Sequence, residues 1–103
     1  MKTVLCHGVF DLLHPGHVAH LAEAKELGDR LVVSVTANHY VAKGPGRPVF
    51  PTHQRLYMLQ ALSVVDEVIV SMEPTAIGSI RLVSPSVYVK GPDYKALEYG
   101  DDP

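Results

Sequence analysis

The stretch CHGVFDLLHPGHVAHL, residues 6–21, holds four of the six histidines of the chain and follows a short apolar run. Gly8 comes at the end of that run, where a residue without a Cβ lets backbone amides approach a ligand closely. Pro15 suits the first position of a helix, which places His14 at the helix N-terminus. Helix N-termini carry N–H groups without intrahelical partners and the positive end of the helix dipole. The stretch therefore predicts a strand, a loop and a helix whose N-terminus binds an anion.

Four short apolar, β-branched runs are spread along the chain, and we predict that each is a strand. They are Thr3–Cys6, Arg30–Thr36, Glu67–Met72 and Ser86–Lys90. Their residues are apolar almost without interruption instead of alternating with polar ones, which is typical of strands covered on both faces. We therefore expect helices on both sides of the sheet.

Helical patterns separate these runs, over residues 15–27, 53–63 and 74–83. Gly28 is expected to cap the first helix at its C-terminus, and Thr52 is expected to be the N-cap of the second. Alternating strands and helices predict an α/β fold of the Rossmann-like kind, with a doubly wound parallel sheet. In such a sheet the carboxyl ends of the strands meet at one edge, where functional residues gather.

The composition indicates one small domain that acts on small molecules. The 103 residues include nine basic and eleven acidic ones, for a net charge of −2, and the charges form no runs. This pattern argues against nucleic acid or a membrane surface as partner. No apolar run approaches the roughly 18 residues of a membrane span. Cys6 is the single cysteine, which excludes an internal disulfide and fits a reducing cytoplasm.

His14 and His17 are three residues apart, so a helix places their Cβ atoms about 5–6 Å apart on one side. That separation suits two donors that bind oxygens of one polyphosphate. A metal site formed with His20 is an alternative, but His20 lies further round the helix and well down it. Ordinary solvated or capping histidines are a second alternative, which does not explain their combination with the neighbouring glycines. Phosphate binding is the favoured interpretation.

The motif is similar to the GxFDxxHxGH signature of the cytidylyltransferase-like nucleotidyltransferases. The matching residues are Gly8, Phe10, Asp11, His14, Gly16 and His17. The resemblance implies transfer of a nucleotidyl group from a nucleoside triphosphate to a phosphorylated acceptor, with Mg²⁺ bound through the phosphates. It also implies strand order 3-2-1-4 and nucleotide binding by Gly8, Val9, Phe10 and Gly16. Asp11 is expected to contact the acceptor, to hold a metal-bound phosphate or to tie the loop to its own backbone.

The loop KGPGRPVFPTHQR, residues 43–55, brings positive charge to the same edge. Lys43 is similar in position to a family lysine that contacts phosphates, whereas Arg47 is interpreted as a solvated loop residue. Arg55 falls in the first turn of a helix, on the side facing the core, where the helix dipole disfavours a cation. A bound anion would remove that conflict, and the family has a phosphate-binding arginine near here; a structural ion pair is the alternative. The expected catalytic residues are His14, His17, Lys43 and Arg55.

The stretch VKGPDY, residues 89–94, follows the fourth predicted strand. In the order implied by the family it lies beside the first strand's loop. Lys90 and Gly91 are expected at the nucleotide and Asp93 at the acceptor, although a tight Gly-Pro turn is the simpler interpretation. The stretch resembles KGGDY of heptose-phosphate adenylyltransferase domains.

A departure from the family pattern bears on the domain boundaries. The family usually carries a Ser/Thr-rich motif that opens a helix after a fifth strand, and nothing here corresponds to it. We therefore expect residues 1–103 to form a single nucleotidyltransferase domain that is incomplete at its C-terminal end and acts as a homodimer. An adenylyltransferase acting on a sugar phosphate is favoured; a glycerol-phosphate-type cytidylyltransferase and a non-catalytic nucleotide-binding module are the alternatives.

Overall fold

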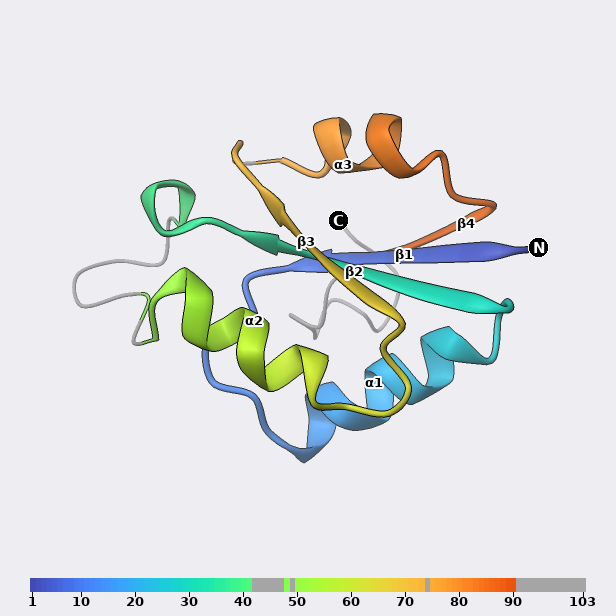
Figure 1. The fold of residues 1–103 in the computed structure, drawn as a ribbon, viewed down its shortest axis with the longest axis horizontal. Helices are drawn as coiled ribbons and strands as arrows, with labels where there is room; N and C mark the ends of the chain where they lie inside the picture. Colours follow the sequence, from blue (N-terminus) through green and yellow to red (C-terminus); the bar gives the residue numbers. More distant parts are fainter. Residues whose placement is uncertain (42–47, 49, 74, 91–103) are drawn as a thin grey trace.

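The structure is a computed structural model that describes residues 1–41, 48, 50–73 and 75–90, with the backbone alone at residue 90. Strands and α-helices alternate along the described chain, with one short 3₁₀-helix among them (Figure 1). In order they are β1 (Thr3–Gly8), α1 (Pro15–Lys25), β2 (Arg30–Thr36), η1 (Asn38–Tyr40), α2 (Thr52–Gln60), β3 (Glu67–Ser71), α3 (Ile77–Val83) and β4 (Val87–Lys90). Among the described residues, no helix is long and apolar enough to cross a membrane.

The four strands form one parallel sheet in the order β3-β2-β1-β4, which confirms the expected order. α1 and α2 cover one face of the sheet and α3 covers the other, below and above the sheet in Figure 1. His7 of β1 pairs with Ser34 of β2 on one side and with Lys90 of β4 on the other. The strand order reverses at β1, so the switch point lies at the carboxyl end of this strand.

The hydrophobic core lies mainly between the sheet and the two helices α1 and α2. Its fully buried members are Val4, Cys6, Leu21, Leu31, Val33, Val35 and Leu59. Leu5 and Val32 are equally buried at the alternate strand positions, which face α3. Burial on both faces explains why β1 and β2 are apolar almost without interruption. Burial also raises the pKa of the Cys6 thiol to about 12, so this cysteine is a core side chain and not a nucleophile.

The end of α1 differs from the expectation. The helix ends at Lys25 with Glu26 as its C-cap, so Gly28 is not the cap. A Cβ on Gly28 would lie 2.7 Å from the carbonyl oxygen of Lys2. Glycine is therefore needed here because the turn between α1 and β2 passes close to the backbone at the start of β1.

The start of α2 also differs, because Thr52 is the first helical residue and Pro51 holds the N-cap position. The Thr52 hydroxyl donates to the side-chain oxygen of Asn38 at 2.9 Å. It also accepts a hydrogen bond from the backbone N–H of Asn38 at 3.1 Å. The hydroxyl that was expected to cap α2 instead ties this helix to η1. α3 begins at Ile77, later than expected.

Candidate active site

The loop after β1 turns the chain from the sheet edge toward the start of α1. Phe10 makes this turn with a φ of 50°, although it is not a glycine. This left-handed conformation is uncommon and unfavourable for a bulky side chain. The Phe10 ring is 3% exposed and packs against His17, with the ring centroids 6.1 Å apart. Core packing at Phe10 thus holds the strained turn that leads to the motif.

His14 and His17 form a reciprocal cap at the N-terminus of α1. His14 is the N-cap residue, and its Nδ1 accepts a hydrogen bond from the backbone N–H of Gly16 at 3.0 Å. The backbone N–H of His14 donates to Nδ1 of His17 at 3.1 Å. The ring centroids lie 4.0 Å apart. The structure therefore brings the two histidines together in the arrangement of a capping box.

The N–H groups in the first turn of α1 all have partners within the protein or are missing, whereas the sequence predicted that they are available to an anion. Pro15 has no N–H, and Gly16 donates to the His14 ring. The N–H groups of His17 and Val18 donate to the His14 carbonyl oxygen at 2.9 and 3.2 Å. What this helix end offers to an anion is therefore the two imidazole rings and the positive end of the helix dipole.

The hydrogen bonds assign the same tautomer to both imidazoles. A backbone N–H donates only to a ring nitrogen that carries no proton, so Nδ1 of His14 and Nδ1 of His17 are both unprotonated. The proton of each neutral ring then lies on Nε2. Each histidine carries one N–H donor on the nitrogen that does not take part in the cap.

Gly16 is required by the ring of His14. A Cβ at residue 16 would lie 2.8 Å from Cε1 and 3.1 Å from Nδ1 of that ring. These distances are shorter than van der Waals contact, so a side chain would push the ring away from the cap. The glycine between the two histidines is thus explained by packing against the first of them.

Arg55 is fully buried and joins the ends of β1 and β2 to the start of α2. Its acceptors are the carbonyl oxygens of Val9, Thr36 and Phe50, at 2.7–2.9 Å, and the side-chain oxygens of Asn38 and Thr52, at 2.8 and 3.4 Å. A guanidinium has five N–H donors, so the protein itself provides an acceptor for each. We call Arg55 with these acceptors the Arg55 brace. Its geometry does not favour the direct phosphate contact that was predicted for Arg55.

Asp11 lies in the same buried region and is 3% exposed. Its Oδ1 accepts a hydrogen bond from the backbone N–H of Phe50 at 2.9 Å, while Arg55 binds the Phe50 carbonyl. Burial lowers the pKa of the Arg55 guanidinium, and the charge of Asp11 opposes that shift. Of the roles predicted for Asp11, this geometry favours tying the loop, with the backbone of residue 50 as a partner.

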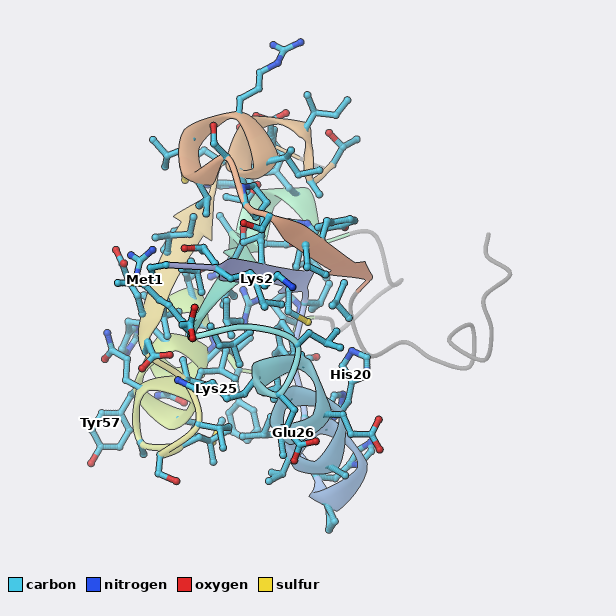
Figure 2. The ribbon with its side chains drawn as sticks, turned by 90° about the vertical axis from the view of Figure 1, so that its right-hand side faces the viewer. Met1, Lys2, His20, Lys25, Glu26 and Tyr57 are labelled. Carbon is cyan, nitrogen blue, oxygen red and sulfur yellow. The ribbon has the colours of Figure 1, made fainter. Side chains whose placement is uncertain are left out.

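His20 lies further along α1, on the side away from α2, whereas Lys25 turns toward α2 (Figure 2). Within the described ranges, no group of three or more His, Cys, Asp or Glu side chains is placed to hold a metal ion. The alternative of a metal site formed by the three histidines of α1 and its cap therefore has no support in the structure.

Three residues of the predicted site, Lys43, Gly91 and Asp93, lie outside the described residues, and so does the loop residue Arg47. Lys90 is described by its backbone, which pairs with His7 at the end of β1. The ladder therefore brings the start of the 90–94 stretch beside the loop that leads to the capping box, as the strand order required.

Two residues of the site were missed in the sequence. Asn38 orients Arg55 by accepting from its Nη2 at 2.8 Å. Thr36, the last residue of β2, offers its carbonyl to Arg55 and donates its hydroxyl to the Gly8 carbonyl at 3.4 Å. Polar residues directly after a buried apolar strand, at the carboxyl edge of a parallel sheet, are the signal that points to them.

Relatives cover nearly the whole chain. The Bifunctional protein HldE of Aeromonas hydrophila subsp. hydrophila is 50% identical over 99 residues, a match that covers 94% of this chain and 21% of that protein. The protein of the same name from Vibrio parahaemolyticus serotype O3:K6 is also 50% identical over 99 residues, with the same coverage. The chain thus spans about a fifth of the length of these curated relatives.

A solved structure and a family model agree with these relatives. The crystal structure of the lipopolysaccharide core biosynthesis protein from Thermoplasma volcanium GSS1 superposes with a TM-score of 0.80 at 38% identity, covering 92% of this chain and 78% of that one. The Cytidylyltransferase-like family model matches residues 5–99, a range that contains the capping box and the Arg55 brace. This chain belongs to the cytidylyltransferase-like family.

Proposed function

We propose that this domain transfers a nucleotidyl group, with AMP favoured, from a nucleoside triphosphate to a sugar phosphate and releases pyrophosphate. The observation that carries the proposal is the pair of capped imidazoles, 4.0 Å apart, at the switch point of a parallel sheet. Membership of the family supports the reaction class. The KGPDY stretch, and a relative whose name places it in lipopolysaccharide core biosynthesis, support a sugar phosphate as acceptor.

The reaction is an in-line displacement at phosphorus. An oxygen of the acceptor phosphate forms a bond to the α-phosphorus, and the bond from that phosphorus to the oxygen bridging to the β-phosphate breaks. The electron pair of the broken bond leaves with pyrophosphate. Because the acceptor phosphate is already anionic, no general base is needed, and the protein contributes position and charge stabilisation. His14 and His17 donate from Nε2 to phosphate oxygens on which negative charge increases.

The capping box uses Nδ1 of both rings as hydrogen-bond acceptors. A proton added to Nδ1 of either ring would replace an acceptor by a donor and break a bond to the backbone. The heat of nucleotide binding is therefore expected to be the same in buffers of different ionisation enthalpy. A heat that changes with the buffer would mean that an imidazole takes up a proton and leaves the cap.

Arg55 acts in this proposal as a positioning residue. Its bond to the Val9 carbonyl fixes the loop in front of the capping box, and its bond to Phe50 fixes the end of the 43–50 loop. Lys43 on that loop supplies positive charge to the triphosphate. The proposal assigns Lys90 and Gly91 to nucleotide binding and Asp93 to acceptor binding, as the sequence motif suggests.

Mg²⁺ accompanies the triphosphate in this proposal. The groups of the capping box are N–H donors, and the nearby carboxylate of Asp11 is buried and bonded to the backbone of residue 50. N–H donors suit phosphate oxygens and not a hard cation, and the Asp11 carboxylate already has a backbone partner, so the phosphates themselves would hold the metal. When bound, Mg²⁺ neutralises charge on the phosphates.

Isotope exchange with the full-length protein tests the proposal. Labelled pyrophosphate is incubated with ATP or CTP, with and without a panel of sugar phosphates and glycerol phosphate. We expect label to enter ATP only when a sugar phosphate is present, because direct displacement needs the acceptor. A thermal-shift screen of the same compounds identifies the acceptor by the increase in Tm that it causes together with the nucleotide.

Each other pattern of exchange contradicts a specific part of the proposal. Label entering CTP in the presence of glycerol phosphate would identify a cytidylyltransferase. Label entering a triphosphate without acceptor would show a covalent nucleotidyl-enzyme in place of direct displacement. Nucleotide binding without exchange under any condition would identify a non-catalytic binding module.

A further inference from the structure

The face of the sheet beneath α3 carries a row of polar side chains where a core would normally be apolar. The row consists of Ser79 on α3, Ser34 and Thr36 on β2, and His7 on β1. Ser34 is completely buried, and Thr36 and Ser79 are 3% and 5% exposed. Buried polar groups without partners are unfavourable by about 1–3 kcal/mol each, so their hydrogen bonds decide whether this row is tolerated.

Hydrogen bonds connect the row from one end to the other. The hydroxyls of Ser79 and Ser34 are 2.6 Å apart, and Ser34 Oγ is 3.0 Å from Nδ1 of His7. Nε2 of His7 is 3.4 Å from the Thr36 hydroxyl, which is also 3.4 Å from the Gly8 carbonyl oxygen. We call this the His7 chain; it begins on α3 and ends at the first glycine of the histidine motif.

The last acceptor sets the direction of every bond in the His7 chain. The Gly8 carbonyl has no proton, so the single hydrogen of the Thr36 hydroxyl points to it. Nε2 of His7 must then carry the proton that lies between it and Thr36, and Nδ1 is the acceptor. Ser34 donates to Nδ1 and accepts from Ser79.

A neutral His7 agrees with its surroundings. Burial lowers the pKa of this histidine, and the charge of Glu73 partly opposes that shift. Both ring nitrogens have partners within the chain, so the neutral ring is fully hydrogen-bonded.

Two consecutive carbonyls of the loop are thus bound by buried polar groups from different elements. The Gly8 carbonyl accepts from Thr36 at the end of the His7 chain, and the Val9 carbonyl accepts from Arg55 at the start of α2. The strained turn at Phe10 follows directly, with a φ of 50°. Fixing the two peptides before a strained turn fixes the direction in which the loop leaves the sheet toward His14.

We infer that His7 and Thr36 are positioning residues of the nucleotide site: the Thr36 hydroxyl holds the Gly8 carbonyl, and His7 orients that hydroxyl. The inference rests on the proposed function for its effect on turnover. The hydrogen bonds of the His7 chain, their direction and the bond to the Gly8 carbonyl are properties of the folded protein, so they can be measured without substrate.

Three variants of the full-length protein test the inference. Thr36→Val keeps the shape of the side chain and removes the hydroxyl, Thr36→Ser keeps the hydroxyl, and Ser79→Ala removes only the far end of the chain. We expect Thr36→Val to lower kcat about tenfold with a smaller change in KM, Thr36→Ser to restore it, and Ser79→Ala to stay within about twofold. Equal losses of kcat in Thr36→Val and Ser79→Ala, or no loss in either, would overturn the positioning role.

Nuclear magnetic resonance of the substrate-free protein tests the tautomer of His7 and the bond from Thr36 to the Gly8 carbonyl. We expect the imidazole correlations of His7 to show the proton on Nε2, and the Val9 amide signal to shift in Thr36→Val but not in Ser79→Ala. A proton on Nδ1, or an unmoved Val9 signal in Thr36→Val, would overturn the inference whether or not the wild-type protein transfers nucleotides. If Thr36→Val does not fold, the tautomer of His7 in the wild type and the turnover of Thr36→Ser still test the inference. Absence of turnover in the wild type, with the expected spectra, would instead contradict the proposed function.

Discussion

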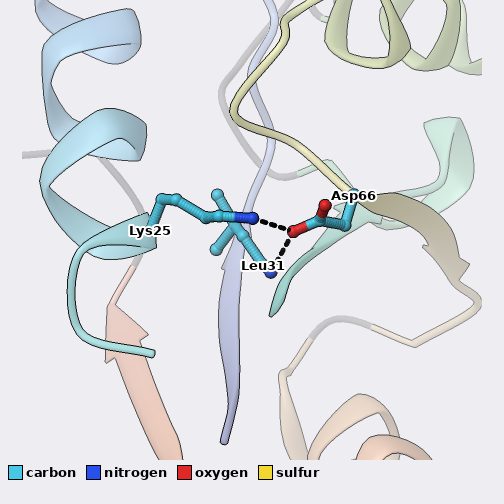
Figure 3. Close-up of polar contacts among 3 residues, drawn as sticks. All are labelled: Lys25, Leu31 and Asp66. Carbon is cyan, nitrogen blue, oxygen red and sulfur yellow. Dashed lines mark hydrogen bonds and ion pairs between the residues drawn. The ribbon is translucent and has the colours of Figure 1, made fainter. Parts of the chain in front are cut away.

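At the amino ends of the strands the sheet is tied by exposed ion pairs, whereas at the carboxyl ends it is held by buried polar groups. Lys25 on α1 lies 2.5 Å from Asp66, whose side chain is 38% exposed and also accepts from the Leu31 N–H at 2.7 Å (Figure 3). Arg30 and Glu67 form a second exposed pair. At the opposite end, Arg55 has no exposed surface at all.

The two edges differ in what replaces a hydrogen-bond or ion-pair partner that a substitution removes. Water takes the place of either partner in an exposed pair, so the loss of one is a small change in stability. A buried group has no such replacement, and its partners are left without hydrogen bonds. We therefore expect substitutions of the buried polar groups at the carboxyl edge to lower stability more than substitutions of the exposed pairs at the amino edge.

Replacing Arg55 by leucine should have the largest effect on stability. The variant leaves the Asp11 carboxylate and three carbonyl oxygens of the Arg55 brace without their cation, so we expect a loss of about 3–5 kcal/mol in the free energy of unfolding. Urea unfolding measures this loss. Arg55→Lys keeps the charge but has only three donors, so it should recover part of the loss. A leucine variant within about 1 kcal/mol of wild type would contradict the brace.

Replacing His17 should mainly affect turnover. We expect His17→Ala to lower kcat by a factor of about 10² to 10³, as for the loss of one preorganised donor. His17→Asn is the matched variant, because its side-chain oxygen still accepts from the His14 N–H while the Nε2–H donor is lost. Both variants should lose the same turnover, and the asparagine variant should keep the stability of wild type. If His17→Asn keeps its turnover, the histidine acts only through the cap.

The fold was largely predictable because it depends on local patterns. The apolar runs predicted all four strands, and Pro15 marked the start of α1 correctly. The roles of Gly28 and Thr52 were wrong, because each is decided by a contact with a distant segment: Gly28 with the backbone of residue 2, and Thr52 with Asn38. Tertiary contacts of this kind leave no local pattern in the sequence.

The sequence allowed us to predict which residues form the site, but not which hydrogen bonds they make. The spacing brought His14 and His17 together, yet nothing in the spacing shows that their Nδ1 atoms cap the helix. Arg55 was placed correctly on the core side of α2. Its acceptors lie in three stretches, at residues 9, 36–38 and 50–52, and the first two approach Arg55 only in the folded chain, so the brace was not visible in the sequence.

Two glycine-to-alanine variants, one at each edge of the sheet, should show smaller effects that differ in kind. A Cβ on Gly28, at the amino edge, would lie 2.7 Å from a backbone oxygen and 2.7 Å from Val4, so Gly28→Ala should lower the free energy of unfolding by about 1–3 kcal/mol with kcat unchanged. A Cβ on Gly16 would push the exposed ring of His14 from the cap, so Gly16→Ala should lower kcat, while the helix propensity of alanine offsets the lost cap bond and keeps stability within about 1 kcal/mol of wild type. Unfolding curves and turnover of the two variants, measured side by side, check the contrast. The opposite assignment of effects would contradict it.

Replacing Asp66 by asparagine should have the smallest effect, and one that depends on pH. Hydrogen bonds from Lys25 and from the Leu31 N–H hold the pKa of this carboxyl below its usual value of about 3.9. The stability that ionised Asp66 contributes is therefore fully present above that pH. It is lost as the pH falls through the lower pKa that this carboxyl has in the folded state. Because the pair is exposed, we expect Asp66→Asn to be less stable than wild type by no more than about 1 kcal/mol at neutral pH, with the difference shrinking in acid and in high salt. Urea unfolding at several pH values measures it. A difference that stays constant with pH would mean that the Asp66 charge contributes nothing, and one as large as that of Arg55→Leu would remove the distinction between the two edges.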